Sequence, residues 1–427
     1  MREMKDSGIE WIGEIPADWG TRKNKYLLNS MYSGGTPSAG NSDFYAVDSG
    51  IPFVSISDMS STDYVRTTKK ALTEEGRADK NLEILPIGTI LYSIYATVGA
   101  VSELAIEATI SQAMLALNLK STVDKQYYKY CLCSMKDYIF GTANGNTQFN
   151  LNAEKVWNFV FPFPIIDEQQ RISYYLDQRC AEIDAVIERT KATIEEYKKL
   201  KQSIITEAVT KGIRGDRPMK ESGIEWIGEI PAEWDVVRIK TLFDYRNERN
   251  FKPLEEVNLI SLYTDLGVVQ HCDLEATTGN KASNADGYKL VYEDDIVVNI
   301  ILCWMGAIGR SAYTGVTSPA YDVYSPKEGT NTKFYHHLFR TQGFSGDCYK
   351  VGRGIMAMRW RTYSDQFRAI KVVAPPQEEQ QEIVDYLDKK CAEMDTLIAR
   401  KTALLAEMES YKKSVIYEYV TGKKEVK

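Results

Sequence analysis

The chain has 427 residues, of which 44% are hydrophobic and 26% are charged, and its formal net charge is −7. This composition is typical of a globular protein of about two or three domains, and it excludes a disordered or fibrous chain. A negative net charge argues against a uniformly basic nucleic-acid binder, although the local charge decides what a phosphate meets. The sequence shows no long apolar run and no secretory signal, so a cytoplasmic location is expected.

The first recognisable element is a motif that occurs twice. DSGIEWIGEIPADW covers residues 6–19, and ESGIEWIGEIPAEW covers residues 221–234, so the offset is 221 − 6 = 215 residues. A second pair of matching segments starts at Glu168 (EQQRISYYLDQRCAEIDAVIER) and at Glu379 (EQQEIVDYLDKKCAEMDTLIAR), with an offset of 379 − 168 = 211 residues. The two offsets indicate a duplication, in which each half holds the motif, a variable block and a long helix.

The first variable block, residues 20–163, is predicted to be mixed α/β. The apolar, β-branched runs at residues 51–59 and 88–104 predict strands, and SGGTPSAGNSDF at residues 33–44 predicts a long surface loop. GTANGNTQFNLN at residues 141–152 is neutral and rich in Asn, Gln and Thr. These side chains can hydrogen-bond to adenine edges or to phosphates, or they can belong to an ordinary polar loop.

Each block is followed by a predicted long helix, at residues 164–213 and 376–427. Apolar residues recur at heptad spacing along both segments, which is typical of a coiled-coil seam. The seam residues are Leu176, Ile183, Ile187 and Ile194 in the first helix and Leu387, Met394, Ile398 and Leu405 in the second. Gly212 and Gly422 follow the helical pattern as C-terminal caps would.

A helix of this length needs a partner for its seam, and its repeat is the nearest candidate. A twofold relation between the repeats would make the helices antiparallel. The alternative is that each helix packs on its own block without pairing. The predicted fold class is therefore α+β, with two α/β domains separated by two long antiparallel helices that form a coiled coil, and with an internal pseudo-twofold duplication.

The second variable block, residues 235–375, contains the most basic stretch of the chain. Strands are predicted within residues 294–315 and 367–376. Residues 349–371 hold six Lys or Arg residues against one Asp, a local charge of +5. Arginine side chains between aromatic residues suit contact with phosphates or guanine edges, although a solvated basic surface has the same composition.

Sequence signatures of catalysis are missing. The chain has no P-loop, no glycine-rich dinucleotide or S-adenosylmethionine loop, and no Asn/Asp-Pro-Pro-aromatic tetrad. Its three histidines lie in one block without a nucleophile motif, and its seven cysteines follow neither a disulfide nor a zinc spacing. We therefore predict a non-catalytic binding protein without a metal site.

Three segments carry a resemblance to a known family: SGGTPS in the first block, GIEWIGEIPAEW before the second, and PPQEEQQEIVDYLD at the last helix. With the half-chain duplication, they make the chain resemble the specificity subunit of type I restriction–modification systems over essentially its whole length. The resemblance implies an N-terminal target recognition domain (1–163), a spacer helix (164–213), a C-terminal target recognition domain (214–375) and a second spacer helix (376–427). Each domain would read one half of a bipartite DNA site.

The resemblance also implies partners. Two adenine-N6 methyltransferase subunits would dock on the repeated framework, and two motor–nuclease subunits would join them. S-adenosylmethionine, ATP and Mg²⁺ would be used by these partners, and no cofactor is expected on this chain. The second block has no GGTPS loop, so the two half-sites should differ and the target should be asymmetric.

The expected contact residues follow from these segments. Those expected at DNA are Thr36, Ser38, Asn41, Asn144, Asn146, Gln148, Arg353, Arg359, Trp360 and Arg361. Those expected at the methyltransferase partners are Trp11, Ile12, Trp226 and Ile227. Two other functions stay open from sequence: a coiled-coil adaptor that binds proteins only, and a DNA-acting enzyme with an unrecognised site.

Overall fold

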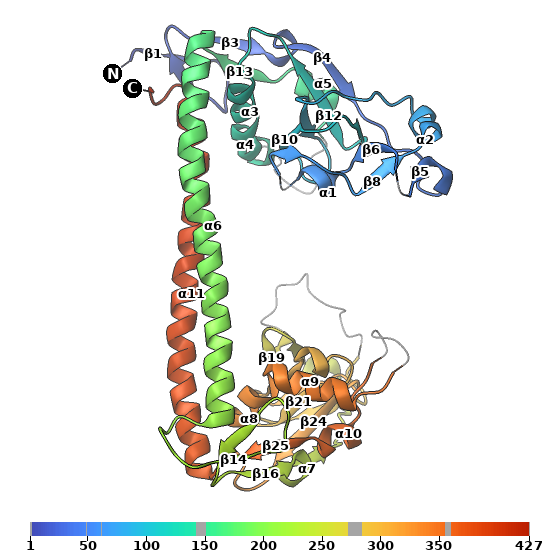
Figure 1. Cartoon of the computed structure of the whole chain (residues 1–427), viewed down its shortest axis with the longest axis vertical. Helices are drawn as coiled ribbons and strands as arrows, with labels where there is room; N and C mark the ends of the chain where they lie inside the picture. The colour runs from blue at the N-terminus through green and yellow to red at the C-terminus, as the bar shows by residue number, and fades with distance from the viewer. Residues whose placement is uncertain are drawn as a thin grey trace. The chain divides into compact units, whose positions relative to one another are not determined.

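The computed structural model of the chain describes residues 2–47, 49–60, 62–141, 151–271, 284–354 and 360–426 (Figure 1). The chain forms two compact units. Unit 1 is Met1–Thr190 with Ala403–Lys427, and unit 2 is Lys191–Thr402. Each unit contains one globular part and half of each long helix. The domain boundaries expected from the sequence stay predictions, because the compact units divide both helices.

The two long helices are α6 (Ile166–Lys211) and α11 (Gln377–Val420). The first begins and ends within two residues of the predicted segment. The second ends at Val420, two residues before Gly422, the glycine that was predicted to end it. Gly212 and Gly422 have φ values of +77° and +71°, so both adopt the left-handed conformation predicted for helix caps.

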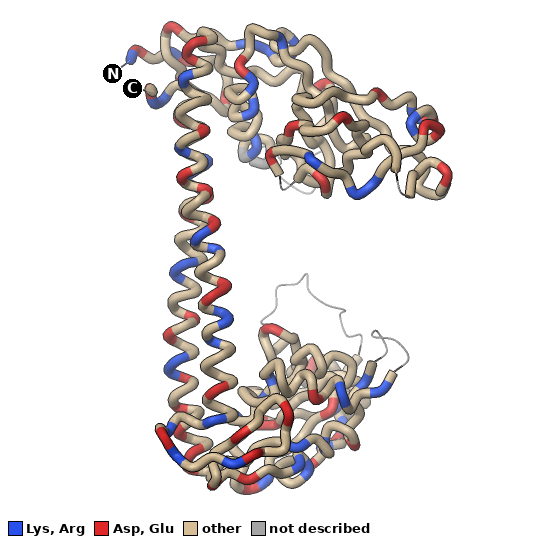
Figure 2. Tube along the Cα trace, viewed as in Figure 1, with Lys and Arg blue, Asp and Glu red and all other residues tan. Residues whose placement is uncertain are grey.

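Within each unit the two helix segments lie side by side and antiparallel. In unit 1 the Tyr175 and Tyr419 hydroxyls are 3.1 Å apart, and Lys412 pairs with Asp184 at 2.7 Å. In unit 2 Lys201 pairs with Asp395 at 2.7 Å. Basic and acidic residues alternate along both helices (Figure 2). The alternative without pairing is therefore wrong within each unit.

The predicted seam residues line this contact unevenly. Those on the first helix are buried, with exposed fractions of at most 8%, and Leu387 is fully buried. The other three on the second helix, Met394, Ile398 and Leu405, are only half-buried. The apolar stripe of the second helix is therefore not completely covered by the first.

The globular part of unit 1 is built on a five-stranded sheet of order β4-β12-β9-β10-β7. Its strands are β4 (Leu28–Ser33), β12 (Met114–Leu119), β9 (Ile90–Ser93), β10 (Val101–Leu104) and β7 (Tyr64–Val65). A four-stranded sheet holds β11 (Thr109–Ile110), β6 (Ile51–Val54), β8 (Lys70–Leu72) and β5 (Tyr45–Ala46). The helices are α1 (Ile56–Met59), α2 (Glu74–Asp79), α3 (Lys125–Ser134), α4 (Lys136–Gly141) and α5 (Ala153–Trp157). The strand predicted at residues 51–59 thus ends at Val54, where the Ser55 capping box starts α1.

The globular part of unit 2 is built on a four-stranded sheet of order β17-β24-β21-β22. Its strands are β17 (Phe243–Arg246), β24 (Tyr321–Pro326), β21 (Ile296–Asn299) and β22 (Ile308–Arg310). Two smaller pairs are β18 (Ile260–Tyr263) with β19 (Gly267–Gln270), and β20 (Lys289–Val291) with β23 (Gly315–Thr317). The helices are α7 (Ile239–Leu242), α8 (Thr332–Phe339), α9 (Gln342–Val351) and α10 (Ser364–Ala369). Residues 367–369, predicted as strand, belong to α10.

The repeated motif forms the same small hairpin in each unit. The hairpins are β1 (Met4–Asp6) with β2 (Glu14–Pro16), and β14 (Met219–Glu221) with β15 (Glu229–Pro231). A second short pair then leads into each long helix, formed by β3 (Gly20–Lys23) with β13 (Val160–Phe163) and by β16 (Asp235–Arg238) with β25 (Lys371–Ala374).

The two variable blocks also share a central topology. β4-β12-β9-β10 and β17-β24-β21-β22 have the same strand order, and every neighbouring pair in both series is antiparallel. Blocks with unlike sequences therefore use the same sheet.

Candidate nucleic-acid and partner interfaces

In unit 2 the repeated motif is attached to the start of α11 by a buried glutamate. Glu379 is fully buried, accepts a hydrogen bond from the Trp234 indole N–H at 2.9 Å and pairs with Arg217 at 2.6 Å. The Arg217 guanidinium also lies over the Trp234 ring, 5.5 Å from its centroid. Because an isolated buried carboxylate is strongly unfavourable, the hydrogen bond and the ion pair offset the cost of burying Glu379.

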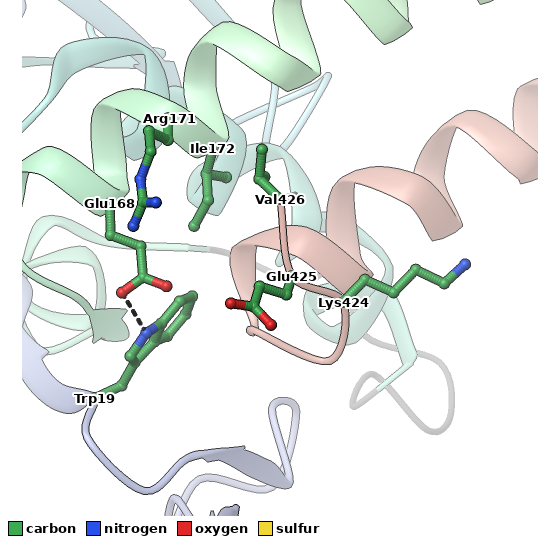
Figure 3. Close-up of a pocket in the computed structure, with 7 residues that line it drawn as sticks. All are labelled: Trp19, Glu168, Arg171, Ile172, Lys424, Glu425 and Val426. Carbon is green, nitrogen blue, oxygen red and sulfur yellow. Dashed lines mark hydrogen bonds between the residues drawn. The ribbon is translucent and has the colours of Figure 1, made fainter. Parts of the chain in front are cut away.

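Unit 1 repeats this arrangement at the start of α6. Glu168 accepts a hydrogen bond from the Trp19 indole N–H at 2.9 Å (Figure 3) and pairs with Arg2 at 2.6 Å. The hydrogen bond to Glu168 raises the pKa of Arg2 above its ordinary value. Figure 3 also places Lys424, Glu425 and Val426 of the C-terminal segment around this pocket. We call each Trp–Glu–Arg arrangement a helix latch.

The same motif contacts the end of the other long helix through a lysine. In unit 2 the Lys211 ammonium donates to the carbonyl oxygens of Ile227, at 3.0 Å, and of Glu229. In unit 1 Lys423 donates to Ile12, at 2.9 Å, and to Glu14, at 3.4 Å. Each copy of the motif therefore joins the start of one helix to the end of the other, which explains why the motif is repeated.

Sequence reasoning missed the latch residues. Glu168 and Trp19 are 149 positions apart, and Glu379 and Trp234 are 145 positions apart. A signal was nevertheless present in the sequence. Each glutamate occurs at the same position of its repeated helix, and each tryptophan occurs at the same position of its repeated motif.

The side chains expected at a protein partner are mostly buried. Ile12 and Ile227 have exposed fractions of 1% and 6%, and Trp11 is 9% exposed. Ile12 and Trp11 belong to the core of unit 1, and Ile227 belongs to that of unit 2. Trp226 is half-buried and donates its indole N–H to Asp347 at 2.7 Å. The expectation of direct contact through Ile12 and Ile227 is corrected, because these side chains pack inside their own unit.

Each unit instead carries a groove beside the C-terminal half of one long helix. Groove 1, in unit 1, lies between α11, α4 and the motif, with Trp11, Lys136 and Tyr138 on its wall. Groove 2, in unit 2, lies between α6, α8 and the turn after β21, with Trp304, His337 and Arg340 on its wall. Five pairs of helix residues that are 211 positions apart line the two grooves, one member of each pair in each groove. They are Lys198 and Glu409, Gln202 and Lys413, Ser203 and Ser414, Ile205 and Ile416, and Thr206 and Tyr417.

Groove 2 holds its histidines in the neutral form. Burial lowers the pKa of His336 to about 3 and that of His337 to about 4. The Nδ1 atom of His336 accepts the Arg310 backbone N–H at 3.1 Å, which requires an unprotonated nitrogen. The Arg340 guanidinium donates to the carbonyl oxygens of Ile308, Thr264 and Asp265. Groove 2 thus has a fixed cation in its wall and uncharged imidazoles beside it.

Three of the residues expected at DNA lie in the loop after β4. Thr36 is half-buried, and its hydroxyl oxygen accepts the Gln112 backbone N–H at 3.5 Å. Ser38 is exposed, and the Asn41 side chain caps a short 3₁₀ helix by accepting the Asp43 N–H at 3.1 Å. Asn144, Asn146 and Gln148 lie outside the described residues. Of this set, Ser38 presents the most accessible polar group.

Two of the expected DNA residues of unit 2 form an isolated antiparallel bridge. Arg353 and Arg361 exchange two backbone hydrogen bonds, of 2.8 and 2.9 Å. The Trp360 ring stacks on Tyr349 with centroids 5.0 Å apart, and its indole N–H donates to the Tyr349 carbonyl. Arg359 lies outside the described residues. Trp360 therefore packs on its own unit, whereas Arg353 is exposed and Arg361 is half-exposed.

Among the described residues, no group of three or more His, Cys, Asp or Glu side chains is placed to hold a metal ion. The helices in that part of the chain include none with both the length and the apolar character of a membrane span.

Comparison with known proteins gives concordant results. Residues 16–196 and 231–406 match the family described as "Type I restriction modification DNA specificity domain". The chain is 26% identical over 442 residues to the "Putative type I restriction enzyme MjaX specificity subunit" of Methanocaldococcus jannaschii, covering 97% of this chain and 96% of that protein. It is 27% identical over 183 residues to the "Type I restriction enzyme EcoR124I/EcoR124II specificity subunit" of Escherichia coli, covering 41% and 42% of the two chains.

A solved structure shares the fold of the whole chain. It is described as "Structural basis underlying complex assembly and conformational transition of the type I R-M system". The TM-score is 0.67 at 14% sequence identity, and the match covers 96% of this chain and 99% of the other.

Proposed function

This chain belongs to the type I restriction modification DNA specificity family, and from that membership we propose that its two globular parts each read one half of a bipartite DNA target. One observation carries the proposal: the same latches and the same central sheets hold surfaces of unlike chemistry. In unit 1 the loop of residues 34–41 is neutral and polar, whereas an antiparallel bridge of unit 2 carries Arg353 and Arg361. Different surfaces on one framework suit two different half-sites, so the target is asymmetric.

We further propose that the long helices form one antiparallel coiled coil that relates the two halves by a pseudo-twofold axis. Antiparallel pairing inside each unit supports this proposal, since both α6 and α11 run without a break from one unit into the other. The coiled coil would then set the number of base pairs between the half-sites.

Grooves 1 and 2 are the proposed docks for two methyltransferase subunits. Their helix walls are built from equivalent positions, so one partner surface can meet both. The two motor–nuclease subunits would join through the methyltransferases. S-adenosylmethionine, ATP and Mg²⁺ would be bound by these partners, and this chain would contribute no catalytic residue.

Co-expression with the methyltransferase tests the proposal. Sequencing of methylated adenines should show one bipartite, asymmetric motif that is absent when this chain is omitted. Native mass spectrometry of the complex should show two methyltransferase subunits for each copy of this chain. A motif that does not change when the chain is omitted would exclude a role in recognition, and a saturated 1:1 complex would exclude the two equivalent docks.

A further inference from the structure

The two central sheets hold an equivalent turn at one end. In unit 1 the turn joins β9 to β10, and the Ser93 backbone N–H donates to Ala100 O at 2.9 Å. In unit 2 the turn joins β21 to β22, and Asn299 N–H donates to Ala307 O at 3.0 Å. The residues before the two alanines, Gly99 and Gly306, have φ values of +81° and +88°. The two turns therefore share their closing hydrogen bond and their glycine, although the turn of unit 2 (300–307) is one residue longer than that of unit 1 (94–100). Positions in the two turns are therefore compared by counting back from the glycine.

The two units also share a short link between two strands. Ser111-Gln112-Ala113 links β11 to β12, and Ser318-Pro319-Ala320 links β23 to β24. Both links close in the same way, since Met114 N–H donates to Ser111 O at 3.3 Å and Tyr321 N–H donates to Ser318 O at 3.0 Å. The serine and the alanine are kept, while the residue between them changes from Gln to Pro.

In unit 1 these two elements adjoin each other and the loop after β4. The backbone N–H groups of Ile94 and Tyr95 both donate to Ala113 O, at 2.9 and 3.3 Å. On the other side, Gln112 N–H donates to the Thr36 hydroxyl at 3.5 Å. Gly34 permits this approach, because a Cβ atom there would lie 2.3 Å from Ile110 O. Tyr95, Gln112 and Thr36 therefore belong to one continuous surface.

The side chains of this surface are available for a ligand. Tyr95 is 42% exposed and Gln112 is exposed. In the described part of the chain, neither the phenol hydroxyl nor the side-chain amide has a hydrogen-bond partner. The next residue, Ala96, has a φ of +60°, a conformation that costs an alanine roughly 1–2 kcal/mol. Strain of this kind concentrates at functional sites, where the fold holds a side chain in a required position.

The exposed side chains differ between the units, although both units keep the closing hydrogen bond and glycine of the turn and the Ser-x-Ala link. Tyr95 stands four residues before Gly99, and Leu302, which is 37% exposed, stands four residues before Gly306. Gln112 is matched by Pro319. A surface for one shared partner would keep its side chains in both units. A change confined to the exposed positions instead suits two surfaces that select different ligands of one kind.

We propose that Tyr95 and Gln112 determine the base preference of unit 1 for its half-site, an inference that rests on the function proposed above. Gln112 has the donor and the acceptor that pair with the N6 and N7 atoms of adenine in the major groove. The Tyr95 ring packs against the neighbouring base or its sugar, next to Thr36.

The test uses the full chain co-expressed with its methyltransferase. Gln112→Ala is expected to lower the preference for adenine at one position of one half-site by roughly 5- to 100-fold in competition methylation assays. Tyr95→Ala is expected to weaken the same half-site, and the other half-site stays unchanged in both variants. Tyr26→Ala is the matched control. Tyr26 is also an exposed tyrosine, at 56%, and it lies just before the first residue of β4, whereas the loop with Thr36 follows the last residue of β4.

The outcomes separate this inference from the proposed function. If the wild-type chain directs methylation to a bipartite motif, and both variants keep that motif and its base preferences, Tyr95 and Gln112 are not specificity residues. A wild-type chain that directs no methylation would contradict the proposed function itself. Equal thermal stability of variants and control, followed by circular dichroism, ensures that a lost preference does not reflect unfolding.

Discussion

Trp234 donates its indole N–H to the buried carboxylate of Glu379 at 2.9 Å, and this single bond ties the second copy of the motif to the start of α11. Trp19 makes the equivalent bond to Glu168 at the same distance. Because both bonds connect segments that are far apart in the chain, they fix where each globular part meets its helices.

Replacing Glu379 by Gln should lower the free energy of unfolding by about 3 kcal/mol. The amide can still accept the Trp234 N–H, but it leaves the Arg217 charge without its buried counter-ion. Urea denaturation followed by tryptophan fluorescence measures the change. Glu382→Gln is the control, because Glu382 forms an exposed pair with Arg214 that solvent screens, and this change should leave stability almost unaltered. Similar losses in both variants would mean that the latch does not stabilise unit 2.

Replacing Leu176 by Ala should cost about 2–5 kcal/mol, since the side chain is fully buried at the start of the helix contact. Leu200→Ala in the same helix is the control, because Leu200 is 46% exposed and should change stability by about 0.5 kcal/mol at most. The measurement is again denaturant unfolding. Equal effects would contradict the assignment of Leu176 to the seam.

Lengthening both helices should lengthen the DNA spacer. Seven residues inserted after Ala192 in α6 and seven after Ala403 in α11 keep the heptad register and add about 10 Å of helix. At roughly 3.4 Å per base pair, the methylated motif should keep its half-sites and gain about three base pairs between them. Insertion into α6 alone is the control, since it shifts the partners of Lys201 and Asp184 and should reduce stability. An unchanged spacer in the double insertion would refute the role of the helices in spacing.

Arg361→Ala should weaken binding to all DNA sequences evenly and reduce the salt dependence of affinity by about one unit, as expected for one lost phosphate contact. Arg361 is the backbone bridge partner of Arg353, so this part of unit 2 carries two arginines on neighbouring segments of the chain. Fluorescence anisotropy at several salt concentrations measures the slope, with the methyltransferase present. Arg400→Ala, an exposed arginine of α11, is the control for the loss of one charge. If the slope stays at the wild-type value, the basic stretch is a solvated surface.

The stability of unit 2 should fall as the pH drops from 7 towards 4. Burial lowers the pKa of His336 to about 3, whereas an unfolded histidine has a pKa of about 6.5. Between these values the unfolded chain binds more protons, so its population rises as pH falls. His336→Gln keeps an acceptor for the Arg310 N–H and should show a smaller loss of melting temperature between pH 7 and pH 5. The same pH dependence in both proteins would exclude His336 as its source.

The long helices could be predicted from sequence because heptad spacing and capping glycines are local signals. Gly422 marked the end of α11 to within two residues. The strand expected at residues 51–59 was cut short by the Ser55 cap, a local signal that the β-branched run concealed.

The interfaces were less predictable, because they depend on segments that are distant in sequence. The basic stretch predicted an arginine-rich surface, but the packing of Trp360 on Tyr349 is a tertiary contact. The shared turn of the two central sheets is marked in sequence only by Gly-Ala and Ser-x-Ala. Such short matches acquire meaning only when the strands on either side are known.

The residue ranges that make up the two units also determine the order in which the units can fold during synthesis. Unit 2 is one continuous stretch, Lys191–Thr402, so every residue that it needs has been made once Thr402 has been added. Unit 1 also requires residues 403–427, whose Val415, Ile416 and Val420 are buried in its core. Domains that are made first usually fold first on the ribosome, but unit 1 cannot complete its core until the last residues of the chain have been made. Until then the nascent unit 1 exposes the core surface that α11 will cover.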